Sequence, residues 1–157
     1  MISILFVCLG NICRSSAAQE ILQTYLNKKG VINQFKVDSA GLINYHKGEL
    51  PDKRMRDHAS KRGYILTHLS RPIAKDDIKN FSYIIAMDRS IYNSVKEMVE
   101  NPEDYKKIFL MQDFSLNYRD EKDVPDPYYG GSEGFEHVLD MLEDSCEVFS
   151  DILIKNL

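Results

Sequence analysis

Short apolar runs and amphipathic stretches alternate along the chain. Residues 2–7 and 81–87 are apolar on both faces, which is typical of strands in a parallel sheet that is covered on each side. Residues 35–41 and 107–111 are predicted to form two further strands. Between the first two strands in chain order, apolar positions at helical spacing predict a helix over residues 15–29. Strand, helix and strand at this spacing predict a right-handed βαβ unit.

The remaining amphipathic stretches predict more helices. Shorter ones are expected over residues 52–62, 73–80 and 88–100, and Asp88 is expected to cap the third. After a polar connection at residues 112–132, a stripe at i+3/i+4 spacing predicts a long helix whose core face comprises Phe135, Val138, Leu139, Leu142, Cys146, Phe149 and Leu153. Cys146 belongs to this stripe and is therefore predicted to be an ordinary core residue.

These elements predict one domain over residues 1–157. Its expected fold is α/β, a three-layer, doubly wound arrangement with a parallel sheet of about four strands and helices on both faces. The basic residues of the predicted helix at 52–62 are interpreted as a solvated helix face rather than a binding patch; they are Lys53, Arg54, Arg56, Lys61 and Arg62.

Composition excludes several classes of function. The net charge is −4, with 20 Lys and Arg against 24 Asp and Glu, which argues against sequence-independent binding of nucleic acid. No apolar run approaches membrane-spanning length, and we expect a cytoplasmic monomer with no membrane association. The three cysteines are expected to be reduced. The four histidines lack ligand spacing, so no metal or other cofactor is predicted.

Residues 8–15, Cys-Leu-Gly-Asn-Ile-Cys-Arg-Ser, lie between the first strand and the first helix. Open α/β sheets bind their ligands at this edge, and the start of a helix attracts anions. Gly10 is expected to take a positive φ so that backbone N–H groups turn inward around an anion. Arg14 can grip two phosphoryl oxygens. The sequence thus predicts a phosphate-binding loop after the first strand, formed by Leu9, Gly10, Asn11, Ile12, Cys13 and Ser15.

Cys8 stands at the base of this predicted loop. Nearby cations and helix N-termini favour the thiolate form of a cysteine, so we interpret Cys8 as a nucleophile aimed at a bound phosphorus. The alternative is a small buried residue in an ordinary turn. Cys13 is either a packing residue or the partner of Cys8 in a disulfide that protects the nucleophile from over-oxidation.

A candidate general acid lies far along the chain, in the polar connection. Asp126 stands between Pro125 and Pro127, which hold it in an extended conformation. A carboxyl group held in this way can protonate a leaving group and then activate water, although an ordinary turn aspartate is the alternative. Tyr128 and Tyr129 could wall a slot and stack on an aromatic leaving group. A deep slot would favour phosphotyrosine, because phosphoserine is too short to reach its floor.

Residues 7–15 resemble the signature of the low-molecular-weight protein tyrosine phosphatases, and residues 126–129 are similar to that family's acid loop. The resemblance extends over essentially the whole chain through residues 38–41, His68 with Arg71, and residues 86–88. It implies that the catalytic residues are Cys8 as nucleophile, Arg14 as phosphate clamp and Asp126 as general acid and base. It also implies that a hydrogen-bond network supports the loop, formed by Asn11, Ser15, Ser39 and His68.

Two departures from the family pattern are visible. Ser16 and Ala17 replace the Pro-Met that many members have, which should change helix entry only slightly. Tyr45 stands where the slot rim often carries Trp, and together with His46 it is expected to alter substrate preference. The predicted substrate slot comprises Ile12, Tyr45, Tyr128 and Tyr129.

Three alternative functions fit the sequence less well than this hypothesis. Arsenate reductases of this fold need further cysteines in mid-chain, and none occurs between Cys13 and Cys146. Related protein-arginine phosphatases have Thr where Ile12 stands. A cysteine phosphoryl carrier or phosphate-binding module would need no general acid, and Asp126 argues against it. The favoured hypothesis is hydrolysis of phosphotyrosine monoesters on tyrosine-phosphorylated proteins and of small aryl phosphates, with inorganic phosphate as product.

Overall fold

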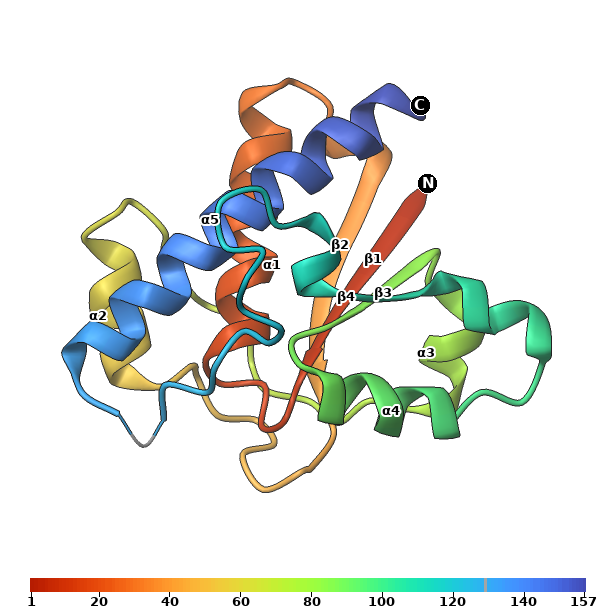
Figure 1. The fold of residues 1–157 in the computed structure, drawn as a ribbon, viewed down its shortest axis with the longest axis horizontal. Helices are drawn as coiled ribbons and strands as arrows, with labels where there is room; N and C mark the ends of the chain where they lie inside the picture. The colour runs from red at the N-terminus through yellow and green to blue at the C-terminus, as the bar shows by residue number, and fades with distance from the viewer. Residues whose placement is uncertain (129) are drawn as a thin grey trace.

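The computed structural model describes residues 1–128 and 130–157, so the predicted slot residue Tyr129 lies outside the described residues. A four-stranded, fully parallel sheet with strand order β2-β1-β3-β4 forms its centre (Figure 1). The strands are β1 (Ile2–Cys8), β2 (Phe35–Gly41), β3 (Tyr83–Ala86) and β4 (Ile108–Leu110). The predicted sheet is confirmed.

Helices cover both faces of the sheet, which confirms the three-layer fold. Side chains alternate along β1, so that Ile4 and Phe6 join one core cluster while Leu5 and Val7 join another. The first cluster lies under α1 (Arg14–Lys28), α2 (Lys53–Ser60) and α5 (Ser132–Lys155), and the second under α3 (Lys75–Asn80) and α4 (Arg89–Glu97) (Figure 1). Three short 3₁₀ segments complete the structure: η1 (Ile32–Gln34), η2 (Pro102–Lys107) and η3 (Met111–Phe114).

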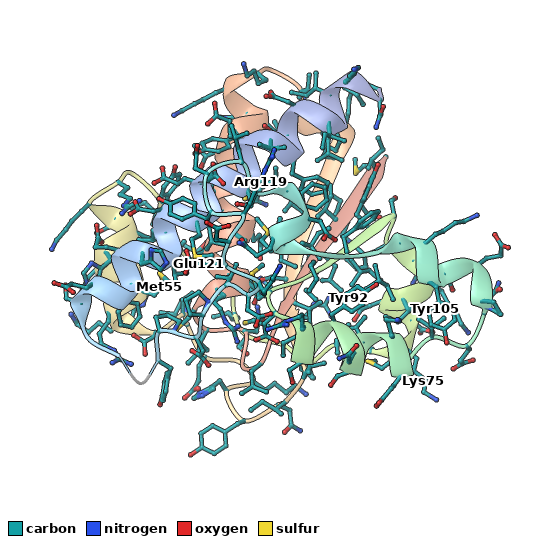
Figure 2. All side chains as sticks on the ribbon, in the orientation of Figure 1. Met55, Lys75, Tyr92, Tyr105, Arg119 and Glu121 are labelled. Atoms are coloured by element: carbon teal, nitrogen blue, oxygen red, sulfur yellow. The ribbon has the colours of Figure 1, made fainter. Side chains whose placement is uncertain are left out.

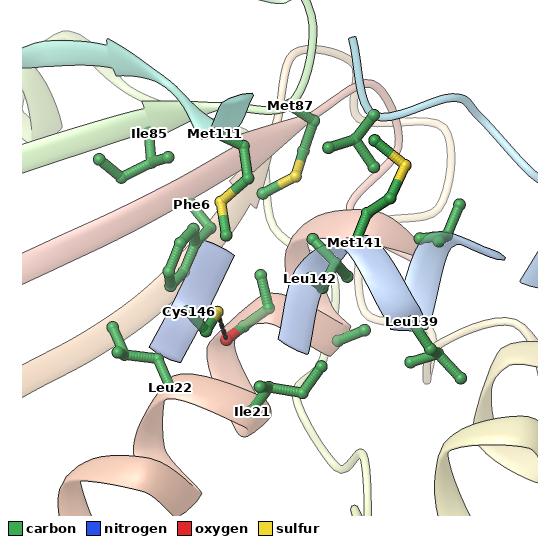
Figure 3. Packing of buried hydrophobic residues seen from close by; sticks show 14 of the residues in the cluster. Phe6, Ile21, Leu22, Ile85, Met87, Met111, Leu139, Met141, Leu142 and Cys146 are labelled. Atoms are coloured by element: carbon green, nitrogen blue, oxygen red, sulfur yellow. Dashed lines mark hydrogen bonds between the residues drawn. The ribbon is translucent and has the colours of Figure 1, made fainter. Parts of the chain in front are cut away.

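The long helix α5 packs its apolar stripe against α1 and the sheet (Figure 3). Cys146 is fully buried in this stripe, with its sulfur 3.8 Å from the Ala18 carbonyl oxygen. Burial raises the pKa of the Cys146 thiol. The prediction that Cys146 is a core residue is confirmed.

The second helix, α2, is tied to α5 by packing and by charge. Met55 is fully buried and lies between the two helices (Figure 2). Arg62, just beyond α2, pairs with three carboxylates of α5: Glu136, Asp140 and Glu143. Its guanidinium therefore fastens the two elements together, whereas the exposed Lys53 pairs with Asp57 in its own helix.

Several element ends differ from the prediction by a few residues. The third strand was expected over residues 81–87 but spans only Tyr83–Ala86, and the helix expected to reach residue 100 ends at Glu97. Asp88 caps this helix as predicted, since its carboxylate accepts from the Ile91 N–H at 2.8 Å. Among the described helices, none has the length and apolar character needed to cross a membrane.

Candidate functional site

Cys8 is the last residue of β1, and Arg14 is the first residue of α1. The five residues between them form a tight loop at the carboxyl edge of the sheet. Gly10 was expected to supply a positive φ, but this prediction is wrong, because Asn11 is the loop residue in the left-handed region, with φ 59°. Space is also tight at Gly10, because a Cβ there would lie 3.1 Å from Cδ2 of His46 and the imidazole ring would have to shift by a few tenths of an ångström.

Asn11 adopts this conformation because its side chain is held on every side. Its amide nitrogen donates to the hydroxyls of Ser15 (2.8 Å) and Ser39 (2.9 Å). Its amide oxygen accepts from Nε2 of His68 and from the backbone N–H of Arg71, both at 3.1 Å. Asn11 is fully buried, and four hydrogen bonds satisfy its amide group. The structure thus brings together the four residues expected to support the loop.

Cys8 lies at the floor of this loop. Its buried sulfur is 2.9 Å from the Ser15 hydroxyl oxygen. Because that oxygen already accepts the amide proton of Asn11, the hydroxyl proton of Ser15 is available to the sulfur. Ser15 can therefore stabilise negative charge on Cys8.

Arg14 connects the loop to two distant segments. Its guanidinium donates to Asp88 Oδ2 (2.6 Å) and to the Val124 carbonyl oxygen (3.0 Å), and Nη2 lies 3.8 Å from Asp126 Oδ2. Burial alone would lower the pKa of Arg14, but the neighbouring Cys8 and the Asp88 carboxylate outweigh it and raise that pKa. Arg14 therefore stays charged inside the protein. The sequence hypothesis treated Asp88 only as a helix cap and did not include it in the site.

Asp126 is carried by residues 123–128, here called the Asp126 loop. The Val124 N–H donates to the Met87 carbonyl oxygen at 3.0 Å, which fastens the loop to the edge of the sheet next to β3. Asp123 accepts from the backbone and the guanidinium of Arg89. The Asp126 side chain is 34% exposed, and its Oδ1 accepts from the Tyr128 N–H at 3.0 Å. A half-exposed carboxylate held over the phosphate loop can exchange protons with a bound ligand.

These groups face one pocket of about 340 Å³. Its lining comprises Cys8, Leu9, Gly10, Ile12, Cys13, Arg14, Ile43, Tyr45, His46, Asp126 and Tyr128. Cys8, Arg14 and Asp126, selected from the sequence, therefore share a single cavity with Ile12, Tyr45 and Tyr128.

Tyr45 and His46 occupy different parts of the pocket. Tyr45 lies at the rim with 82% of its surface exposed. His46 lines the wall, with its ring centroid 6.3 Å from that of Tyr128 and its Nδ1 paired with the Glu49 carboxylate. The sequence hypothesis expected His46, together with Tyr45, to affect substrate preference, and the structure places both residues in the lining of the pocket.

Cys13 is a buried free thiol. Burial, with smaller contributions from Asp52 and Cys8, raises its pKa. Neutral Cys13 is therefore a weak nucleophile compared with a thiolate. Within residues 1–128 and 130–157, no group of three or more His, Cys, Asp or Glu side chains could hold a metal ion.

The similarity to known proteins extends over nearly the whole chain. Residues 3–157 match the family model described as low molecular weight phosphotyrosine protein phosphatase. A low molecular weight protein-tyrosine-phosphatase of Bacillus subtilis is 38% identical over 151 residues, covering 94% of this chain and 92% of the relative. A solved protein tyrosine phosphatase from Entamoeba histolytica, with Hepes in the active site, gives a TM-score of 0.96 at 41% identity and 99% coverage of both chains. A Drosophila arginine phosphatase gives a TM-score of 0.88 at 32% identity, with 96% coverage of both chains.

Proposed function

The chain belongs to the low molecular weight phosphotyrosine protein phosphatase family, and we propose that it hydrolyses phosphotyrosine monoesters on proteins, and small aryl phosphates, through a phosphocysteine intermediate. The observation that carries this proposal is the meeting of Cys8, Arg14 and Asp126 on one pocket. A nucleophile, a cationic clamp and a carboxyl group are the parts that such a reaction needs.

In the first step, the phosphoryl group binds in the loop between Cys8 and Arg14. The Cys8 sulfur attacks phosphorus while the bond from phosphorus to the aryl oxygen breaks. Arg14 and the backbone N–H groups of the loop stabilise the charge on the equatorial oxygens. Protonated Asp126 gives its proton to the departing aryl oxygen, so the leaving group departs as a phenol.

In the second step, Asp126, now a carboxylate, takes a proton from a water molecule. The resulting hydroxide attacks phosphorus, the bond from phosphorus to sulfur breaks, and inorganic phosphate leaves. The Ser15 hydroxyl, 2.9 Å from the Cys8 sulfur, stabilises the departing thiolate. The cycle ends with Asp126 protonated and Cys8 as thiolate, ready for the next substrate.

The pocket walls favour an aromatic ester. The branched apolar side chain of Ile12 and the ring of Tyr128 line the cavity and can contact the two sides of a phenyl ring. The likeness to a Drosophila arginine phosphatase supports phosphoarginine as the second candidate substrate. Rates on matched phosphotyrosine, phosphoserine and phosphoarginine peptides separate these substrates.

The enzyme is further proposed to act as a monomer in the cytoplasm on tyrosine-phosphorylated proteins, with no metal or other cofactor. The supporting observations are the free cysteines Cys8, Cys13 and Cys146, which suit a reducing compartment, and a reaction whose proton transfers are all supplied by side chains of the chain itself.

Kinetics on aryl phosphates test the assigned roles. Cys8→Ser should abolish turnover while inorganic phosphate still binds. Asp126→Asn should lower kcat/KM by roughly 10²–10⁴ for phenyl phosphate, whose leaving group needs a proton, and far less for 2,4-dinitrophenyl phosphate. Asp120→Asn, an exposed carboxylate nearby in the chain, is the matched control and should leave both rates unchanged. An equal loss on both substrates would refute the acid role of Asp126, and normal turnover by Cys8→Ser would refute the phosphocysteine.

A further inference from the structure

Arg54, in the first turn of α2, reaches the Asp126 loop. Its Nη2 donates to the backbone carbonyl oxygen of Tyr128 at 2.9 Å. We propose that Arg54 is a positioning residue that holds the Asp126 loop against the phosphate loop and so keeps the Asp126 carboxyl group over the leaving oxygen. This inference rests on the proposed function.

The peptide groups of Tyr128 make this connection direct. The N–H of Tyr128 donates to Asp126 Oδ1 at 3.0 Å, and the carbonyl oxygen of the same residue accepts from Arg54. Arg54 therefore holds the residue that orients the Asp126 side chain. If Tyr128 moves, Asp126 loses the hydrogen bond from the Tyr128 N–H.

Arg54 is itself held in place from the phosphate-loop side. Its Nε and Nη2 donate to the two carboxylate oxygens of Asp52, at 3.2 and 3.0 Å. The backbone N–H of Asp52 donates to the Ile12 carbonyl oxygen in the phosphate loop at 2.8 Å. A two-point ion pair fixes the plane of a guanidinium group. The path from Ile12 through Asp52 and Arg54 to Tyr128 thus joins the two halves of the pocket.

Ring contacts add to the hydrogen bonds. The Arg54 guanidinium carbon lies 5.4 Å from the ring centroid of Tyr128 and 4.9 Å from that of Phe135. Phe135 is buried in the first turns of α5, directly after the segment that follows the Asp126 loop. Both distances suit a cation over an aromatic ring. The guanidinium therefore contacts both the Asp126 loop, at Tyr128, and α5, at Phe135.

The Asp126 loop is held on both sides of Asp126. Val124 and Asp123 attach the loop before Asp126, to the edge of the sheet and to Arg89. Arg54 attaches it after Asp126. Holding both flanks of a short segment restricts its motion far more than holding one, which is what a proton donor placed to within a fraction of an ångström requires.

Arg54 is too exposed to contribute much to the stability of the folded protein. Its side chain is 47% exposed, and ion pairs of exposed residues contribute little to stability. Asp52 also keeps its capping hydrogen bonds to the backbone N–H groups at positions 54 and 55 when the guanidinium is removed. Removal of the guanidinium should therefore leave the protein folded and act on proton transfer.

The experiment compares kcat/KM for a series of aryl phosphates in Arg54→Met, which keeps the aliphatic stem. The value should fall roughly 10- to 100-fold for phenyl phosphate and by less than about twofold for 2,4-dinitrophenyl phosphate, whose leaving group needs no proton. Arg56→Met is the matched control, because the Arg56 guanidinium lies in the same helix and donates to the Pro51 carbonyl oxygen. It should leave the whole series unchanged.

A double variant tests whether Arg54 acts through Asp126. In the Asp126→Asn background, Arg54→Met should cause no further loss that depends on the leaving group, because coupled residues are not additive. An equal loss on every substrate, or full additivity with Asp126→Asn, would overturn the inference. If Asp126→Asn alone shows no dependence on the leaving group, the acid role in the proposed function fails instead.

Hydrogen exchange tests the positioning role independently of catalysis. Arg54→Met should speed exchange of the Tyr128 amide proton by roughly tenfold, because local opening controls exchange, whereas Arg56→Met should not change it. An unchanged exchange rate in Arg54→Met would refute the anchoring of the loop, whatever the chemistry of the site.

Discussion

Gly41, at the end of β2, gives the most direct structural test of the phosphate loop. A Cβ at this position would lie 2.8 Å from the Leu9 carbonyl oxygen and 3.0 Å from both Asn11 N and Gly10 C. All three are backbone atoms, so no side chain can rotate away. Ordinary contacts begin at 3.4 Å, and Gly41→Ala must therefore move the loop from the strand by about half an ångström.

The magnitude follows from this displacement. Overpacking in a well-packed region destabilises a protein by about 1–3 kcal/mol. A misplacement of about 1 Å in a catalytic constellation can cost roughly 10²-fold in rate, so half that displacement corresponds to about tenfold in kcat/KM. We expect Gly41→Ala to lose about 1–3 kcal/mol of stability and about tenfold in kcat/KM. The protein should stay folded, because native domains have about 5–15 kcal/mol of stability.

Urea unfolding and kcat/KM for p-nitrophenyl phosphate measure the two effects. Gly134→Ala is the matched control, because a Cβ there would meet its nearest atom, Pro127 Cβ, at an ordinary 3.9 Å. In the helix α5 this change should stabilise by about 0.5–1 kcal/mol and leave activity unchanged. Wild-type stability and activity in Gly41→Ala would show that the contact between strand and loop does not constrain the site.

Two further predictions concern the network under the loop. Asn11→Ala places a residue without side-chain hydrogen bonds at φ 59° and leaves the part-buried Arg71 N–H without its acceptor. It should destabilise by roughly 3–5 kcal/mol in urea unfolding, and a loss below about 1 kcal/mol would contradict the network. Burial lowers the pKa of His68, and Asp38 opposes only part of that shift. The unfolded chain therefore binds the proton more tightly than the folded protein does. The free energy of unfolding should be highest above the unfolded pKa of about 6.5 and should decrease as the pH falls below that value. His68→Gln should flatten this decline, and an unchanged slope would exclude His68 as its source.

Local patterns in the sequence were sufficient to predict the architecture of the fold. The four strands, the five helices and the core position of Cys146 follow from apolar periodicity, because each face of an element must be buried or solvated as a unit. Cys8 and Arg14 were found for the same reason, since the residues joining the end of one strand to the start of the next helix form one continuous loop.

The hydrogen-bond partners of the site residues could not be predicted from the sequence as readily. Asp88 and Val124 bind Arg14 from 74 and 110 residues away, and a carbonyl oxygen carries no residue-specific signal. The bracketing prolines marked Asp126, but nothing in its own segment revealed that Arg54 holds the loop. Such contacts depend on how distant segments meet.

The phosphate loop shows both contributions. Sequence by itself determined its position, its cysteine and its guanidinium, because these are set by chain order and by side-chain chemistry. Tertiary structure decided its conformation: Asn11, not Gly10, takes the positive φ, because four hydrogen bonds from three other segments outweigh the lower intrinsic strain of glycine. Intrinsic backbone preference amounts to about 1 kcal/mol, and a buried network satisfied by distant residues exceeds it.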